Sequence, residues 1–237
     1  MKTNVILLRF RLGWALLGII GLVLQWITSS IFIPGFTTTP TSWLTFFSYF
    51  TILTNLFVTV WFILGFVSLQ RGQARWWGDQ PEVKGALMVA GTVTILVYWT
   101  LLKDIPLSGI SGHIANFLLH LAVPGGMWID WLLTQGVIQR TYWQMMGAWL
   151  IFPVAFSLQA EIRGAIVPWY PYFFMDPHAV GGVGPLALWL LVIVILFFAV
   201  ASLIYWLYNV RSSQQSKSVV KPAVKPASGK VARQGRR

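Results

Sequence analysis

Polar side chains follow one another at helical spacing inside an otherwise apolar stretch of this chain. Ser48, Thr51, Asn55 and Thr59 are separated by three or four residues, and Thr54 lies beside them. This spacing puts side chains on one face of a helix. An unpaired polar group in hydrocarbon is costly, so a polar face at membrane depth indicates helix pairing or a function.

A second apolar stretch carries a similar face. His113, Asn116 and His120 follow at spacings of three and four residues, and Asp130 comes later in the same stretch. His120 is the only histidine well inside an apolar segment. Metal ligation is not expected, because the chain offers few histidines and acids and no cysteine at all.

The two faces are expected at the same depth. At about 1.5 Å per residue, Thr51 lies ~12 Å and His120 ~10 Å from the outer ends of their predicted helices. Tyr98 falls at a comparable depth near the end of another predicted helix. Thr51 and His120 are therefore expected to be able to meet, with Thr54 as an alternative to Thr51.

A hydroxyl beside a histidine has two interpretations. The histidine can act as a general base that turns a weak alcohol into a nucleophile. Threonine, asparagine and histidine also form hydrogen bonds between membrane helices, worth about 1 kcal/mol each, with no chemistry involved. Both interpretations are open at this stage.

The composition indicates a polytopic membrane protein. Of the 237 residues, 57% are hydrophobic and 10% are charged, and several apolar stretches approach the ~20 residues that cross a bilayer as a helix. The sequence predicts an all-α bundle of six transmembrane helices at residues 12–33, 43–69, 85–102, 113–133, 142–158 and 185–208. Residues 1–211 form this domain, and residues 212–237 form a basic tail expected to be disordered.

The distribution of Lys and Arg predicts that both termini are cytoplasmic. With the N-terminus inside, the outer segments hold only Lys103 and Arg163, and every other basic residue is cytoplasmic. The net charge of +11 then reflects topology and attraction to anionic lipid headgroups rather than nucleic acid binding.

The polar stretches also carry a family resemblance. The segment from Phe47 to Leu56, His120 ahead of Val123-Pro124, and the later Asp130-Trp131 resemble the prokaryotic six-transmembrane "Pr-six-Pr" membrane proteins. Those proteins are similar in turn to the androgen-induced family of integral membrane threonine hydrolases. The resemblance covers roughly residues 8 to 208.

The resemblance implies an activity and its residues. The animal proteins are understood to cleave fatty acid esters of hydroxy fatty acids, and their intramembrane threonine and histidine correspond here to Thr51, with Thr54 the rival, and His120. A Tyr-Pro pair in an outer loop has a possible counterpart in Tyr170-Pro171. The resemblance also implies residence in a bacterial inner membrane.

The leading hypothesis is an intramembrane lipid ester hydrolase with no metal or organic cofactor. Thr51 would attack, His120 would take its proton, and Asn55, Asn116 or Tyr98 could bind the ester or its oxyanion. Membrane lipids and a lipid-like substrate are the expected partners. Two alternatives stay open, a non-catalytic lipid or small-molecule binder or transporter and a membrane scaffold, with the same residues serving helix packing.

Overall fold

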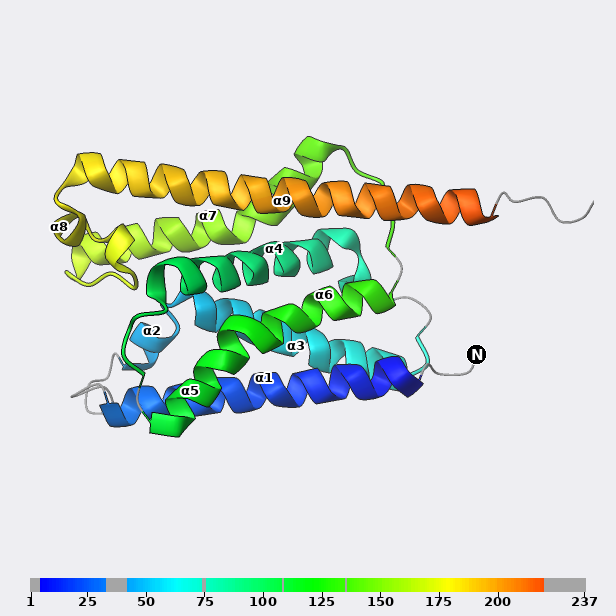
Figure 1. Ribbon diagram of the computed structural model, residues 1–237, viewed down its shortest axis with the longest axis horizontal. Helices are drawn as coiled ribbons and strands as arrows, with labels where there is room; N and C mark the ends of the chain where they lie inside the picture. The colour runs from blue at the N-terminus through cyan, green and yellow to red at the C-terminus, as the bar shows by residue number, and fades with distance from the viewer. Residues whose placement is uncertain (1–4, 33–41, 74–75, 108, 135, 220–237) are drawn as a thin grey trace, which may run out of the picture.

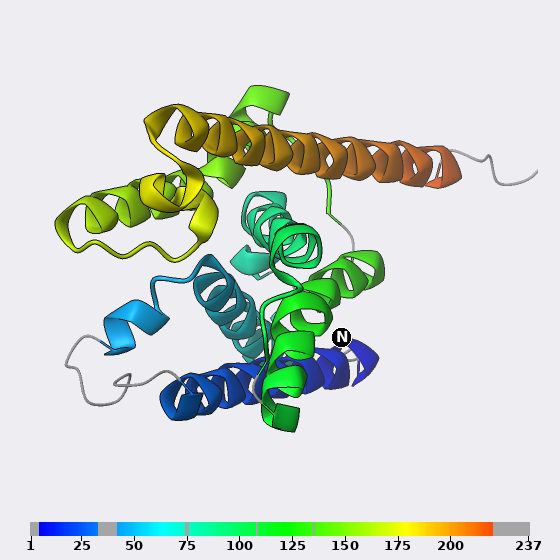
Figure 2. The same cartoon turned by 60° about the vertical axis from the view of Figure 1, so that its left-hand side comes forward.

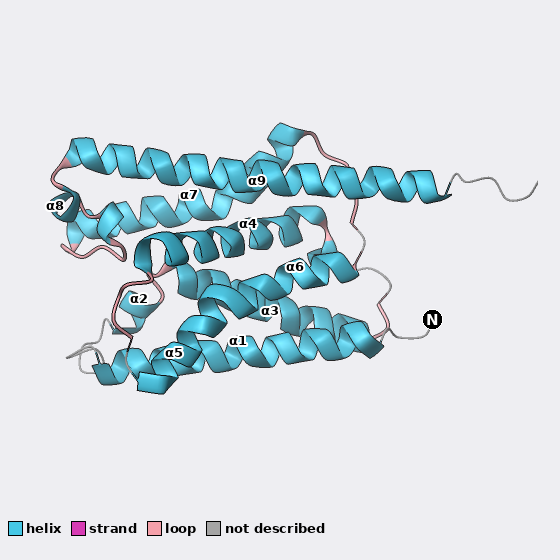
Figure 3. Cartoon of the chain, viewed as in Figure 1, coloured by secondary structure: helices cyan, strands magenta, loops and turns pink. Residues whose placement is uncertain are grey.

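The computed structural model describes residues 5–32, 42–73, 76–107, 109–134 and 136–219, and these residues form helices and connections without a strand (Figures 1 and 3). Two short 3-10 turns and two π-helical segments interrupt the α-helices. The α-helices are α1 (Val5–Phe32), α2 (Ser42–Phe46), α3 (Phe50–Gln70), α4 (Pro81–Val97), α5 (Gly109–Phe117), α6 (Val123–Leu133), α7 (Tyr142–Ile166), α8 (Pro177–Val180) and α9 (Val183–Val219). The 3-10 turns are η1 (Trp77–Asp79) and η4 (Phe173–Met175), and the π-helical segments are η2 (Tyr98–Leu102) and η3 (Leu118–Ala122).

Five helical segments are long and apolar enough to cross a bilayer. They are Val5–Ser29, Phe50–Gln70, Pro81–Leu102, Tyr142–Ile166 and Val183–Ser213. The continuous run of α5, η3 and α6 is not among them, and it carries His113, Asn116, His120 and Asp130. These polar residues lower its hydropathy, so composition alone does not mark it as a span.

Helix α4 is the central helix. It packs against α3, α6, α7 and α9, whereas α1 packs against α3, α5 and α6 on the other side of the molecule. The long helices run roughly antiparallel, so the connections gather at two ends (Figures 1 and 2). One end holds α2 and α8, and the other holds the beginning of α1 and the end of α9 (Figure 1).

Helices α1 and α3 approach each other closely at Gly18. A Cβ atom added to buried Gly18 would overlap the side chain of Thr59 on α3. Small residues allow such close approach between membrane helices, which gain little hydrophobic free energy from association and depend on packing. Gly18 therefore sets the distance between α1 and the helix that carries Thr51.

A group of four charged side chains joins the helices at the end opposite α2 and α8, and all of them except Asp79 are buried. Arg11 Nε is 2.8 Å from Asp130 Oδ2, and Lys84 Nζ is 2.7 Å from Asp130 Oδ1. Asp79 Oδ1 lies 2.6 Å from Arg11 Nη2 and 2.9 Å from Lys84 Nζ. Arg11 and Asp130 have fully buried side chains. Two of the bases expected at the membrane interface are therefore paired inside the protein.

Several helix boundaries differ from the expected ones. The helix expected at 142–158 continues to Ile166, so it is long enough to cross a bilayer and takes up the start of the expected outer loop. The last helix runs to Val219, and the rest of the predicted tail lies outside the described residues. The helix expected at 43–69 is broken after Phe46 and begins again at Phe50.

Candidate functional site

The break between α2 and α3 places Thr51 in the first turn of a helix. Tyr49 has an extended backbone conformation immediately before α3, and the hydroxyl of Ser48 bonds back to the carbonyl of Leu44 at 2.6 Å. The first N–H groups of a helix have no partner within it. Thr51 accordingly presents its hydroxyl at a helix N-terminus, together with a backbone N–H that has no partner within the helix. The helix dipole favours negative charge at this end.

His120 lies in the π-helical segment η3, in the middle of the run from α5 to α6. Short π-helical segments are rare and occur frequently at functional sites, because the extra residue in the turn redirects side chains. The ring is partly buried. Its neighbour in the sequence, Leu119, is fully buried against α1 and α3.

The side chains of Thr51 and His120 meet. Thr51 Oγ1 is 3.3 Å from His120 Nε2, and His120 Nδ1 is 3.2 Å from the backbone carbonyl oxygen of Asn116. A carbonyl oxygen can only accept a hydrogen bond, so Nδ1 of the neutral ring carries the hydrogen. Nε2 then has a lone pair and accepts from the Thr51 hydroxyl. This is the orientation that a general base needs.

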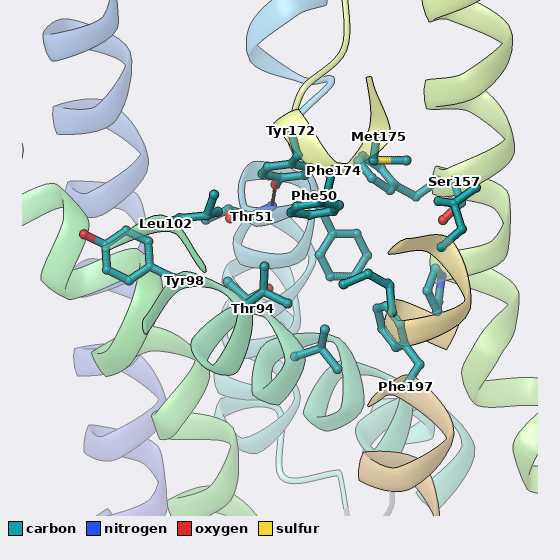
Figure 4. A pocket seen from close by; sticks show the side chains of 16 residues that line it. Phe50, Thr51, Thr94, Tyr98, Leu102, Ser157, Tyr172, Phe174, Met175 and Phe197 are labelled. Carbon is teal, nitrogen blue, oxygen red and sulfur yellow. Dashed lines mark hydrogen bonds between the residues drawn. The ribbon is translucent and has the colours of Figure 1, made fainter. Parts of the chain in front are cut away.

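Tyr98 holds the ring of His120 from one side. The two rings stack with their centroids 4.0 Å apart and their planes 25° from parallel. Tyr98 itself begins the second π-helical segment, η2, and is buried. In Figure 4 its hydroxyl points away from Thr51. Tyr98 therefore orients the histidine, and its expected role as a direct oxyanion donor has no geometric support.

Asn55 connects the two helices that carry Thr51 and His120. Its side-chain nitrogen donates to the carbonyl oxygens of Thr51 at 2.8 Å and Leu119 at 2.9 Å. Both amide hydrogens are thus in use, so the structure shows no Asn55 hydrogen directed at a substrate oxygen. The alternative nucleophile, Thr54, is fully buried, and its hydroxyl has no hydrogen-bond partner within the described part of the chain. Thr51, and not Thr54, lies against His120.

Asn116 remains available to a ligand. It is nearly buried, lines the same cavity as His120, and its side-chain amide makes no hydrogen bond to the part of the chain that the structure describes. His113, from the same predicted face, is exposed. Only part of that face therefore belongs to the site.

Tyr172 is a site residue that the sequence did not indicate. Its hydroxyl accepts a hydrogen bond from the backbone N–H of Thr51 at 3.3 Å (Figure 4). Tyr172 lies in the connection between α7 and α9, and burial raises the pKa of its hydroxyl to about 12. The phenol therefore stays protonated and keeps one hydrogen for a bound group. The Tyr170-Pro171 pair that the resemblance implies lies next to Tyr172 in the sequence. Pro171 lines a cavity, while Tyr170 packs on Gly164.

Two cavities adjoin these residues. The wider one has a volume of about 350 Å³ and is lined by Thr51, His120, Asn116 and Tyr172, together with residues of α1 and of the connection after η2. The narrower one has a volume of about 50 Å³ and lies between α3, α4, α7 and α9 (Figure 4). The walls of both are mostly apolar, which suits a ligand with hydrocarbon parts.

Four charged or titratable side chains near the end of α7 and around α8 lie outside the walls of the two cavities, namely Glu161, Arg163, Asp176 and His178. Glu161 and Arg163 lie within α7 rather than in a loop. Arg163 donates to Thr45 Oγ1 at 3.2 Å and stacks over Trp169. Asp176 caps the short helix α8 by accepting from the backbone N–H of His178.

When the chain is compared with known proteins, no family model, curated protein or solved structure matches it. The interpretation of the site therefore depends on its geometry.

Proposed function

We propose that this protein is an intramembrane lipid ester hydrolase in which Thr51 is the nucleophile and His120 the general base. The observation that carries the proposal is the 3.3 Å contact between Thr51 Oγ1 and His120 Nε2, with the other ring nitrogen held by a carbonyl oxygen. The contact opens on a cavity large enough for part of a lipid. A hydroxyl is a weak nucleophile until a positioned base takes its proton.

Acylation follows from this arrangement. His120 Nε2 takes the proton of the Thr51 hydroxyl as Oγ1 attacks the ester carbonyl carbon. The tetrahedral intermediate collapses when the C–O bond to the alcohol breaks and His120 returns the proton to the leaving alcohol oxygen. The products of this step are an acyl ester of Thr51 and the free alcohol.

The negative charge on the carbonyl oxygen requires hydrogen-bond donors at the moment it develops. Tyr172 fits this role, because its hydroxyl lies against the backbone N–H of Thr51. The Asn116 amide is a second donor on the wall of the wider cavity. The dipole of α3, which begins next to Thr51, adds to the stabilisation of negative charge.

Deacylation uses the same residues in the opposite direction. His120 takes a proton from a water molecule, the hydroxide oxygen attacks the acyl carbon, and the proton returns to Thr51 Oγ1 as the C–O bond to threonine breaks. A free fatty acid leaves, and the enzyme is restored. No metal or organic cofactor enters this scheme.

The proposal includes a membrane setting. The run of α5, η3 and α6 is the sixth transmembrane segment. It packs against α1, α3 and α4, and its Asn116 and Asp130 are buried. Both termini are cytoplasmic, and the site lies in the outer half of a bacterial inner membrane. The basic C-terminal tail contacts anionic lipid headgroups.

The test is labelling of the purified protein in detergent with a lipid-like fluorophosphonate probe. The matched pair is Thr51→Val and Thr54→Val, since each removes one hydroxyl and nearly preserves the shape. We expect labelling of the wild type and of Thr54→Val, and none of Thr51→Val or His120→Ala. Equal labelling of Thr51→Val and Thr54→Val would contradict the proposal.

One observation favours a non-catalytic lipid binder as the second candidate. Most of the wall of the wider cavity is apolar, as in a binding site for an uncleaved lipid. A binder would take up a fluorescent fatty acid analogue without reacting with the fluorophosphonate. Binding of the analogue that is equal in the wild type and in Thr51→Val, with no labelling of either, would support this alternative.

A further inference from the structure

The two cavities share part of their walls. Thr51, Tyr98, Leu102 and Tyr172 line both, so these residues stand at the boundary between the two spaces. An ester with two hydrocarbon parts could therefore place its carbonyl group at the boundary and one part in each cavity. The structure also indicates which part belongs on which side.

The base faces only one of the cavities. His120 lines the wider cavity and is absent from the wall of the narrower one. In the proposed acylation step, His120 must give its proton to the oxygen of the departing alcohol. That oxygen, and the alcohol attached to it, must then lie on the side of His120, and the acyl chain must lie on the other side of the carbonyl carbon.

We infer that the narrow cavity is the acyl-chain site and the wide cavity is the alcohol site. The inference rests on the proposed hydrolase function and specifies the orientation in which the ester binds across the two cavities. It assigns the selection among acyl groups to α4, α7 and α9, none of which carries Thr51 or His120.

The shapes and chemistry of the walls agree with this direction. The narrow cavity is walled mainly by aromatic and branched apolar side chains such as Val93, Phe156 and Phe197, and all three are buried. A single unbranched hydrocarbon chain fits such a space, while an acyl group branched next to the carbonyl does not. The wide cavity has several polar side chains on its wall, namely Gln25, Ser29, Tyr49 and Asn116.

The expected substrates are therefore esters with an unbranched acyl chain and an alcohol that is wider or carries polar groups. Because the wide cavity has about seven times the volume of the narrow one (350 against 50 Å³), discrimination among acyl groups is expected to be strong and discrimination among alcohols weak.

Two matched serine substitutions test the assignment in the full-length protein. Ser157 on α7 lines only the narrow cavity, and Ser29 on α1 lines only the wide one. Each is changed to leucine, which adds similar bulk on either side. Hydrolysis is measured as free acid released from two series of esters. One series varies the acyl group as acetate, hexanoate and pivalate on one alcohol, and the other varies the alcohol as ethanol, decanol and glycerol on hexanoate.

For the wild type we expect hexanoate to be cleaved faster than pivalate, by a factor of about 100 in kcat/KM. Ser157→Leu is expected to lower kcat/KM for hexanoate esters by roughly 10-fold or more, because the added methyl groups displace part of the acyl chain from the narrow cavity. The value for acetate esters is expected to stay unchanged, since acetate has no longer chain to displace. Ser29→Leu is expected to lower kcat/KM for the decanol and glycerol esters relative to the ethanol ester. The ratio of kcat/KM for hexanoate and pivalate esters is expected to stay unchanged. If Ser157→Leu does not fold, Ile193→Phe on α9 narrows the same cavity.

The failure of this inference can be told apart from the failure of the proposed function. If the wild type hydrolyses the esters and Thr51→Val does not, the hydrolase function holds. If in that case Ser157→Leu changes the alcohol preference, or Ser29→Leu the acyl preference, the assignment of the cavities is overturned. If no ester is hydrolysed by the wild type beyond the Thr51→Val background, the hydrolase proposal fails and the inference fails with it.

Discussion

Three of the side chains around Thr51 are each held by a specific contact. Asn55 bonds two backbone carbonyls, His120 is fixed by Asn116 and by the ring of Tyr98, and Tyr172 bonds the N–H of Thr51. Catalytic groups need this kind of support, since a displacement of about 1 Å can cost roughly 100-fold in rate. Tyr172 can be tested at this scale, because donating a hydrogen bond to the oxyanion requires its hydroxyl, whereas packing requires only its ring.

Tyr172→Phe removes one hydroxyl and keeps the aromatic ring in place. We expect the rate of fluorophosphonate labelling to fall by roughly 100-fold, the usual effect of losing one oxyanion donor. The thermal unfolding temperature is expected to change little, because only one weak bond to the Thr51 N–H is lost. Tyr170→Phe is the control, because it removes the hydroxyl of a nearby tyrosine that lines neither cavity. An unchanged labelling rate in Tyr172→Phe would mean that this hydroxyl does not contact the reacting oxygen.

At the scale of the elements, the site depends on how closely α1, α3 and the α5–α6 run pack together. Gly18 lets α1 approach Thr59 on α3, and Gly21 lets α1 approach Leu118 and Leu119 on η3, next to His120. Both glycines lie on the same side of α1, one turn apart. Small residues in α1 therefore control the position of both helices that bear the reacting groups.

Gly18→Ala is expected to destabilise the protein, because the added methyl group overlaps the Thr59 side chain. Overpacking of this kind costs about 1–3 kcal/mol. Gly13→Ala is the matched control, since a Cβ atom at the exposed Gly13 meets nothing within 4 Å. In detergent, thermal unfolding followed by tryptophan fluorescence should show a lower midpoint for Gly18→Ala and an equal or higher one for Gly13→Ala. The reverse order would show that α1 and α3 are not closely packed at Gly18.

At the scale of the whole molecule, the two ends have different chemistry. The catalytic candidates gather toward the end with α2 and α8, and the largely buried ion pairs of Arg11, Asp79, Lys84 and Asp130 gather toward the other. This network joins α1, η1, α4 and α6. Arg211 adds a further link, because its guanidinium donates to the carbonyl oxygens of Trp131 and Leu132 at the end of α6.

Asp130→Asn removes one charge from the buried network without changing its size. Breaking a buried ion pair leaves an uncompensated charge and costs about 3–5 kcal/mol. Glu82→Gln is the control, because it breaks the partly exposed pair of Glu82 with Arg140, and such pairs contribute about 0–1 kcal/mol. In detergent, the midpoint of thermal unfolding should be clearly lower for Asp130→Asn than for Glu82→Gln. A similar midpoint for both would mean that the network contributes little to stability.

The topology can be measured directly, because the chain has no cysteine. A single cysteine at exposed Gln139, in the connection before α7, should be protected from a membrane-impermeant maleimide in intact cells or spheroplasts. A single cysteine at exposed His178, at the other end of the molecule, should react. Labelling of Gln139→Cys with protection of His178→Cys would reverse the proposed orientation.

The sequence by itself determined the helical architecture and placed His120 at the depth of Thr51, but it left open whether Thr51 or Thr54 faces His120. Long apolar stretches specify helices because backbone polar groups in hydrocarbon must be satisfied within the segment. Helical periodicity then set the faces and depths of Thr51 and His120, and these two side chains do meet.

Tertiary structure decided the features that depend on contacts between distant segments. The break at 47–49 has no proline or glycine to indicate it, and the π-helical segments at Tyr98 and His120 have no local sequence signal. The two bonds of Asn55, the approach of Tyr172 and the burial of Arg11 with Asp130 each join residues separated by many positions. Periodicity along one helix cannot give these, because it fixes which face a side chain lies on and not which residue of another helix lies opposite.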